Sequence, residues 1–306
     1  MIDSKTTRYI NPYTDFGFKK LFGTEMNKDL LMSFLNALFG NEEVIKEVKY
    51  MNSERLGDGY GDRRSVFDVY CETEKGEKFI VEMQKAEQRY FKDRSLYYAT
   101  TPIREQAPQG KWDYRLENVY TVGVLDFTFP DKEYPADEYR HVIKLMDVAD
   151  KHVFYDKLTF VYLEMPKFNK SEDELETMFD KWMFALRNLS RLLDRPRALQ
   201  ERVFDKFFEQ AEIAKYSDDE RQEYESSVKD YRDYINTLDT AHQRGWAEGK
   251  AEGKAEGRAE GRAEGRAEGR AEGEQSKAQE IATKLKSMGM STEEIAKVTG
   301  LDASDL

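Results

Sequence analysis

The sequence predicts an α/β protein, in the broad sense that includes α+β folds, with a helical C-terminal extension. Three features support this class: helical spacing of apolar residues near the N-terminus, short alternating runs that follow it, and two continuous β-branched and aromatic runs further on. The 306-residue chain is 39% apolar, with 18 Phe and 18 Tyr, so it can bury a sizeable core. Its charged share of 35% is high for one compact unit and indicates a globular part with a polar appendage.

The predicted core elements follow one another closely. The first clear helix begins after Asn27, its expected N-cap, and Gly40 ends it. Strands and one long helix, which Pro102 is expected to interrupt, come next. The last two strands are continuous apolar runs, as in a sheet covered on both faces. The expected elements are a helix over 28–39, strands over 44–50, 64–73 and 77–84, a helix over 86–101, and strands over 119–127 and 158–165.

The chain divides into four predicted parts. The α/β core occupies residues 1–168, and helical periodicity then predicts an extension over 169–244. Residues 245–274 repeat AEGK and AEGR without an apolar stripe, and each repeat contains a helix-destabilising glycine. This segment is expected to be a flexible or marginally helical linker. Residues 275–306 predict a small helix-turn-helix-like module, for which docking or oligomerisation is favoured over reading DNA.

Composition restricts the function classes. The net charge of −12 argues against a basic, non-specific nucleic-acid coat, although a nuclease needs only a local basic patch. Cys71 is the single cysteine, so an intrachain disulfide is excluded. The N-terminal residues lack the apolar stretch of a signal peptide, and no run of 18 apolar residues occurs. A cytoplasmic protein without a membrane span is expected.

Residues 66–84 predict a β-hairpin with acidic residues on one face. Glu74-Lys75-Gly76 suits a three-residue loop with Gly76 in the left-handed conformation. Thr73 then lies opposite Glu77, which places Asp68 opposite Glu82, with Gln84 two residues further on the same face. The other face is expected to be core and consists of Phe67, Val69, Cys71, Phe79, Val81 and Met83.

Two carboxylates at opposed positions repel each other, so Asp68 and Glu82 need a shared proton, a basic partner or a divalent cation. Carboxylate oxygens suit Mg²⁺ or Mn²⁺, which also bind phosphate. A surface hairpin with two unrelated acids is the alternative, and composition does not decide between them.

Several motifs together resemble one nuclease family. They are the opening segment NPYTDFGFKKLFG over 11–23, Val81-Glu82-Met83-Gln84, the series Arg94, Tyr97, Tyr98, Gln106, Gly110 and Tyr114, the segment LEMPKF over 163–168, and the AEGR array. This combination resembles the Rpn family of recombination-promoting nucleases and putative transposases, an E-x-Q branch of the PD-(D/E)XK nuclease superfamily. The resemblance covers most of the chain.

The resemblance implies a restriction-endonuclease-like core, in which a mixed sheet is flanked by helices. It assigns Asp68 and Glu82 as metal ligands, with the Met83 carbonyl as a third ligand, and the ion as Mg²⁺ or Mn²⁺. Gln84 replaces the common lysine near the attacking water. Glutamine orients water by hydrogen bonds but lacks the positive charge of lysine.

Supporting roles are expected for residues outside the hairpin. Asp15 either joins the metal site or caps the turn that begins at Thr14, with capping slightly favoured. Arg94 either reaches the active site or forms a helix-to-sheet ion pair. The DNA backbone is expected to contact a helical face formed by three basic residues, although such a run is commonly just solvated. They are Lys85, Arg89 and Lys92.

These features predict a Mg²⁺-dependent DNA endonuclease linked to recombination or mobile elements, with DNA and a divalent ion as partners and C-terminal helices that favour self-association. One alternative is a catalytically weak or inactive nuclease fold that acts as a nucleic-acid or protein-binding scaffold. Another is an assembly protein whose sheet domain is purely structural. None of the three histidines falls in a recognisable catalytic or metal-ligand spacing.

Overall fold

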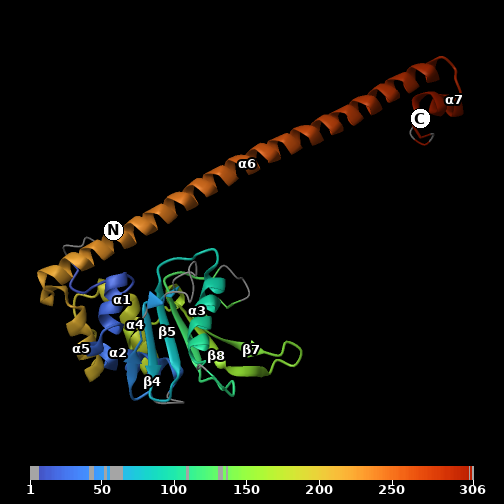
Figure 1. Cartoon of the computed structure of the whole chain (residues 1–306). Coiled ribbons are helices and arrows are strands. Elements are labelled where there is room, and N and C mark those ends of the chain that lie inside the picture. Colours follow the sequence, from blue (N-terminus) through green and yellow to red (C-terminus); the bar gives the residue numbers. More distant parts are fainter. Residues whose placement is uncertain are drawn as a thin grey trace. The chain divides into compact units, whose positions relative to one another are not determined.

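The computed structural model describes residues 7–40, 45–51, 54–55, 65–107, 110–129, 134–135, 137–302 and 304. The chain forms two compact units, Met1–Ile235 and Asn236–Leu306 (Figure 1). Among the described helices, none combines the length and apolar character needed to cross a membrane.

The first unit is built on a mixed six-stranded sheet with the order β1-β4-β5-β6-β8-β7. Strands β5, β6 and β8 are parallel, whereas β1, β4 and β7 pair antiparallel with their neighbours. The strands are β1 Val48–Tyr50, β4 Val69–Thr73, β5 Lys78–Gln84, β6 Val119–Leu125, β7 Arg140–Met146 and β8 Val153–Glu164, with β2 Glu54–Arg55 and β3 Ser65–Val66 paired separately. This arrangement confirms the predicted fold class.

Helices cover both faces of the sheet. On one face, α1 (Asp15–Phe22), α2 (Lys28–Phe39), α4 (Met178–Asn188) and α5 (Arg202–Ala211) enclose the main core, with Trp182 fully buried at its centre. On the other face lies α3 (Phe91–Glu105), which packs over β6 and β8. The short helical turns are η1 Glu25–Asn27, η2 Met165–Lys167, η3 Glu172–Glu174, η4 Leu189–Arg191 and η5 Ile213–Lys215.

Two predicted features of α3 are wrong. The helix begins at Phe91 and not near residue 86, because the preceding residues form a loop. It also continues through Pro102 to Glu105. Pro102 lies in the last turn with its side chain buried, so the packing of this side chain compensates for the backbone N–H donor that proline lacks.

The β4–β5 hairpin confirms the predicted register. The Thr73 N–H donates to the Glu77 carbonyl at 3.0 Å, and Gly76 has φ of +83°. Val69 pairs with Val81, so Asp68 stands opposite Glu82 immediately before the start of β4. The expected continuous strand over 64–73 is interrupted at Phe67 and Asp68. Phe67 therefore packs with Tyr70 and Ile80 on the α3 face. It is fully buried, as predicted for a core residue, but its predicted position on the face of Val69 and Cys71 is wrong.

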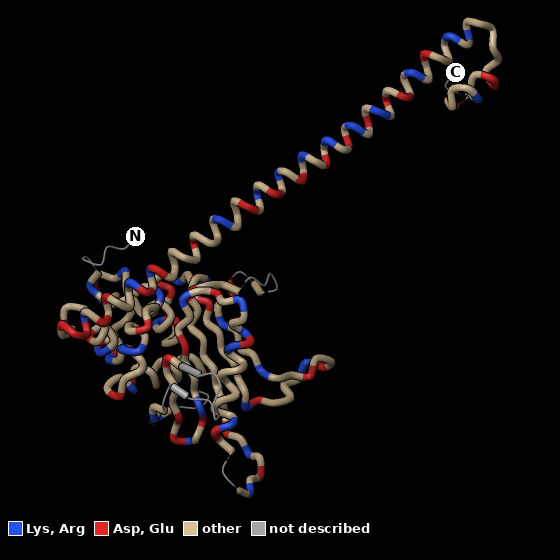
Figure 2. The backbone as a smooth tube through the Cα atoms, turned by 45° about the horizontal axis from the view of Figure 1, so that its top comes forward, with Lys and Arg blue, Asp and Glu red and all other residues tan. Residues whose placement is uncertain are grey.

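The helix α6 spans Asp218–Ser287 and includes the whole AEGK/AEGR array, which had been expected to be flexible or marginally helical. Acidic and basic residues alternate along the array (Figure 2). A Cβ added at any array glycine meets nothing within 4 Å. In the second unit, α7 (Thr292–Thr299) has the predicted Ser291–Glu294 capping box, and Gly300 ends it in the left-handed conformation.

Candidate functional site

The interruption before β4 places the Asp68 carboxylate at the end of the hairpin. In a continuous antiparallel ladder, the Met83 N–H would donate to the backbone carbonyl of Phe67. Here it donates to Asp68 Oδ2 at 2.8 Å. A side-chain carboxylate therefore replaces a ladder carbonyl, which fixes Asp68 beside β5.

Glu82 is buried on the neighbouring strand, with 7% of its surface exposed. Its Oε2 accepts from Gln84 Nε2 at 2.8 Å, whereas Oε1 is buried and has no hydrogen-bond partner among the described residues. A buried carboxylate oxygen without a partner carries a desolvation cost. A bound cation would offset this cost.

The two carboxyl groups have raised pKa values. Burial is the main cause for Glu82, and the charge of Asp68 adds to it, so that its pKa rises to about 8. Burial is also the main cause that raises the pKa of Asp68 to about 6. The hydrogen bond from Met83 opposes this rise, and the charge of Asp15 contributes to it. The two acids therefore share one electrostatic environment, as the predicted register requires.

Arg94 reaches the site from α3. Its guanidinium donates to Gln84 Oε1 and also to Gln88 Oε1. Gln84 in turn donates to Glu82, which gives a continuous chain of contacts from Arg94 to the buried acid. Tyr98, one turn further along α3, lies with its ring centre 5.8 Å from Arg94 Cζ. Arg94 thus contacts Gln84, which is one of the residues predicted for the site.

The opening motif contributes an acid and a base from α1. The N-cap of α1 is Thr14, whose Oγ1 accepts from the Gly17 N–H at 3.0 Å, so Asp15 is not the capping residue. Asp15 pairs instead with Lys19 at 3.0 Å. The charge of Asp15 raises the pKa of Asp68 and that of Lys19 lowers it, which places both near the acidic pair. Lys19 was not among the predicted site residues.

The first turns of α6 hold this opening motif in place. Asn11 N–H donates to the Tyr224 hydroxyl at 2.9 Å, and Phe16 N–H donates to Ser227 Oγ at 3.1 Å. The motif itself is tight, because a Cβ at Gly17 would lie 2.2 Å from the Asn11 carbonyl oxygen. The start of α6 is therefore part of the framework that positions Asp15.

The three predicted DNA-binding residues do not share a helical face. Lys85 and Arg89 lie in the loop before α3, and only Lys92 lies within the helix. Their cationic groups lie over aromatic rings: Lys85 over Tyr231 at 5.9 Å, Arg89 over Tyr90 at 5.3 Å and Lys92 over Phe129 at 5.1 Å. The charge of Lys85 also lowers the pKa of Asp68.

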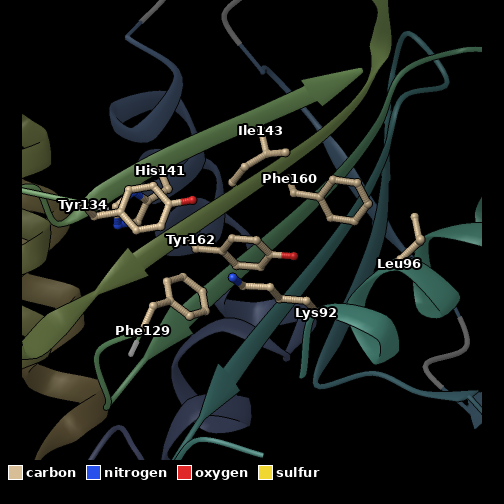
Figure 3. Close-up of a pocket in the computed structure, with 8 residues that line it drawn as sticks. All are labelled: Lys92, Leu96, Phe129, Tyr134, His141, Ile143, Phe160 and Tyr162. Atoms are coloured by element: carbon tan, nitrogen blue, oxygen red, sulfur yellow. The ribbon is translucent and has the colours of Figure 1, made fainter. Parts of the chain in front are cut away.

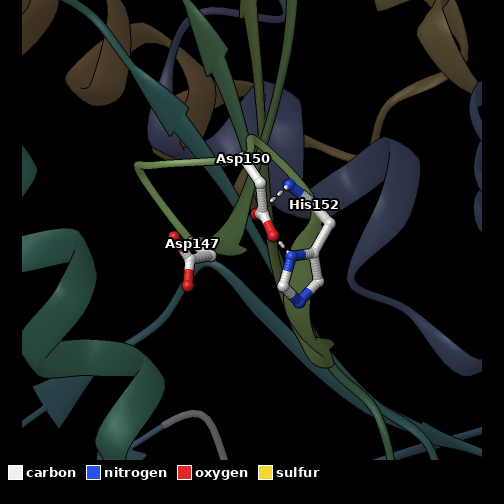
Figure 4. A group of neighbouring side chains, drawn as sticks. All are labelled: Asp147, Asp150 and His152. Atoms are coloured by element: carbon white, nitrogen blue, oxygen red, sulfur yellow. Dashed lines mark hydrogen bonds and ion pairs between the residues drawn. The ribbon is translucent and has the colours of Figure 1, made fainter.

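A second group with metal-ligand chemistry lies at the turn between β7 and β8 (Figure 4). Ligand atoms of Asp147, Asp150 and His152 lie within 4.8 Å of one another, and all three residues are exposed. Asp147 Oδ1 accepts from the Ala149 N–H at 2.8 Å, and Asp150 Oδ1 contacts His152 Nδ1 at 2.5 Å. The hydrogen bonds of the turn are sufficient to explain why these three side chains lie together. Sequence spacing had not indicated it.

In the late motif LEMPKF, the acidic residue has a structural role. Glu164 is fully buried, and its Oε1 contacts His141 Nε2 at 2.5 Å and Lys167 Nζ at 2.9 Å. Its Oε2 accepts from the Phe129 N–H at 2.8 Å. The motif thereby ties β8 to β7 and to the loop after β6.

A mixed sheet flanked by helices, with the buried Glu82 and the half-buried Asp68 side by side at the end of an antiparallel hairpin, defines a restriction-endonuclease-like α/β protein. The family model described as PD-(D/E)XK nuclease family transposase matches residues 12–241. The chain belongs to this family, which confirms the resemblance drawn from its motifs. Comparisons with curated proteins and with solved structures gave no match.

Proposed function

We propose that this chain is a Mg²⁺-dependent DNA endonuclease whose active site is formed by Asp68, Glu82 and Gln84. The observation that carries the proposal is a buried Glu82 oxygen with no hydrogen-bond partner in the described part of the chain, beside a second carboxyl group whose pKa is also raised. The transposase description of the family supports a role in DNA rearrangement.

The residues fit a divalent cation. Asp68 and Glu82 would hold the ion through carboxylate oxygens, and the Met83 backbone carbonyl is a further candidate ligand. Hard oxygen ligands favour Mg²⁺ or Mn²⁺ over softer metals. When bound, such an ion lowers the pKa of a nearby water and offsets charge on the phosphodiester.

The residues around the acids orient the reactants. Gln84 is held at both ends, because its Nε2 donates to Glu82 and its Oε1 accepts from Arg94. Its second N–H and the second lone pair of Oε1 can still position a water. Arg94 supplies the positive charge that glutamine lacks, which favours catalysis over the inactive-scaffold alternative. Lys19 and Lys85, whose charges lower the pKa of Asp68, are the residues that we propose attract the phosphate backbone.

The test is cleavage of plasmid DNA by the full chain in Mg²⁺, in Ca²⁺ and in EDTA. We expect nicking in Mg²⁺ alone, and we expect Asp68→Asn and Glu82→Gln to abolish it. Glu77→Gln is the matched control, since Glu77 is a buried carboxyl of similar exposure, 6%, at the opposite end of the hairpin. Cleavage at equal rates by all four proteins would refute the assignment.

A further inference from the structure

A pocket opens on the α3 side of the sheet, over β7 and β8 (Figure 3). Its volume is about 270 Å³. Aromatic rings dominate its wall, and the rings of Tyr134 and His141 lie 4.4 Å apart. The lining side chains are Lys92, Leu96, Phe129, Tyr134, His141, Ile143, Phe160 and Tyr162.

One residue of the pocket lining, Tyr162, lies near Glu82 of the acidic pair. In the sheet register, Glu82 pairs with Gly123, and Gly123 pairs with Tyr162. The two residues therefore stand two strands apart on one face, about 10 Å between their Cα atoms. The Tyr162 ring covers Gly123, because a Cβ at Gly123 would lie 3.0 Å from this ring. The Tyr162 hydroxyl donates to Ser95 Oγ of α3 at 2.8 Å, which fixes the ring between the acids and the pocket.

The pocket walls have the chemistry of a base-stacking site. Flat aromatic faces stack on any nucleobase, whereas a cationic group at the edge suits the attached phosphate. His141 is held by Glu164, so its ring is a fixed part of the wall. Lys92, which also lines the pocket, places its ammonium 5.1 Å from the Phe129 ring centre.

We propose that this pocket receives one unstacked base of the DNA strand whose backbone is cut at Asp68 and Glu82. The proposal rests on the nuclease function above, because the acidic pair fixes where the backbone passes. A base enters only after leaving its stack, which costs a few kcal/mol in an intact duplex and less at an unpaired nucleotide. The enzyme therefore prefers DNA with a bulged or mismatched nucleotide at the cleavage site over perfect duplex.

The test compares binding to two DNA duplexes with a single-nucleotide bulge. One carries a normal base at the bulge, and the other carries an abasic sugar with the same phosphate. Affinities of the full chain are measured in Ca²⁺, so that binding is read without cleavage. We expect the normal base to bind about 10-fold more tightly, in line with the usual strength of base–aromatic stacking.

The variant Tyr134→Ala should abolish this difference, and Tyr134→Phe, which keeps the ring, should retain it. Tyr134 is 37% exposed, so its truncation leaves the core intact. Phe154→Ala is the control, because Phe154 is an aromatic residue of β8 that is 77% exposed and lies outside the pocket lining.

Three results would refute the proposal that the pocket receives a base. One is equal binding of normal and abasic bulges by the unsubstituted chain, and another is a base preference that survives Tyr134→Ala. The third is preferential binding of a free nucleoside monophosphate with no base preference in DNA, which would assign the pocket to a small nucleotide. Plasmid nicking in Mg²⁺ is scored separately, so loss of the pocket proposal and loss of the nuclease proposal are distinguishable.

Discussion

The protonation of Glu82 allows the acidic site to be tested without catalysis. Burial and the charge of Asp68 raise the pKa of Glu82 from 4.5 to about 8. In the unfolded chain this carboxyl group titrates near its ordinary value. Between these two pH values the folded protein binds a proton that the unfolded chain has lost, so the free energy of unfolding falls as the pH rises.

The size of this effect follows from the shift. Each pH unit between folded and unfolded pKa values corresponds to about 1.4 kcal/mol. Raising the pKa from 4.5 to about 8 gives an upper limit of about 5 kcal/mol. Structural relaxation and water penetration reduce such costs, and we expect about 2–3 kcal/mol to be measured. Glu82→Gln removes the charge at nearly constant shape, so it should raise Tm by roughly 5–10 °C at pH 9 without divalent ions.

The assay is thermal unfolding of the full chain at pH 5 and at pH 9, with and without Mg²⁺. The gain from Glu82→Gln should nearly vanish at pH 5, where Glu82 is protonated in the folded protein. At pH 9, Mg²⁺ should stabilise the unsubstituted chain and leave Glu82→Gln unchanged, because a ligand that binds only the folded state stabilises it.

The matched control is Glu77→Gln. Glu77 accepts from Asn118 Nδ2 at 2.8 Å and from Thr73 Oγ1 at 3.2 Å, so its carboxylate is satisfied. This substitution should be neutral or destabilising at pH 9. A lower Tm for Glu82→Gln at pH 9, like that expected for Glu77→Gln, would refute this reasoning. Glu82 would then not be a destabilising buried carboxylate that a bound cation stabilises.

Three further predictions concern residues that support the site or the array. Arg94→Gln should lower kcat for plasmid nicking about 100-fold, because it removes the positive charge beside Gln84. The double variant that also carries Gln84→Lys should recover part of the lost rate. An unchanged initial rate of nicking by Arg94→Gln would contradict this role. Gly123→Ala should destabilise the fold by about 1–3 kcal/mol, because its Cβ would meet the Tyr162 ring, and an unchanged Tm would show that the ring can yield. Gly261→Ala in the array should raise helix stability by about 1 kcal/mol, measured by circular dichroism, without changing the nicking rate.

The register of the acidic hairpin was predictable because its determinants are local. Loop length and the left-handed Gly76 set which residues oppose each other, and the alternation of apolar residues set the faces. The same reasoning predicted the wrong face of the sheet for Phe67, because an alternating sequence pattern does not show where a strand is interrupted. That break allows the Asp68 side chain, and not a backbone carbonyl, to bond with Met83.

Other elements were missed for physical reasons that act over longer distances. Strand β7 was not predicted, because it lies at the sheet edge with most of its side chains exposed, and its sequence therefore lacks a clear buried face. The start of α3 was placed too early, because Tyr90 at its N-cap makes no side-chain capping bond and resembles no start signal. Nothing local indicates that Lys19 acts on Asp68, since the two residues come from different elements.

The position of α6 explains why the family pattern extends far beyond the acidic residues. The family match ends at residue 241, just past the first unit, which ends at Ile235. Within that unit, Tyr224 and Ser227 bond the backbone of the opening motif, and Tyr231 donates to Asp126 Oδ2 at 2.9 Å. The Asp126 N–H in turn donates to the Gln84 carbonyl at 2.9 Å. Residues distant in sequence thus meet at the end of β5, and the start of α6 positions the same strand that carries Glu82. Truncation before Tyr224 should therefore impair the site itself, whereas truncation after residue 241 should spare it.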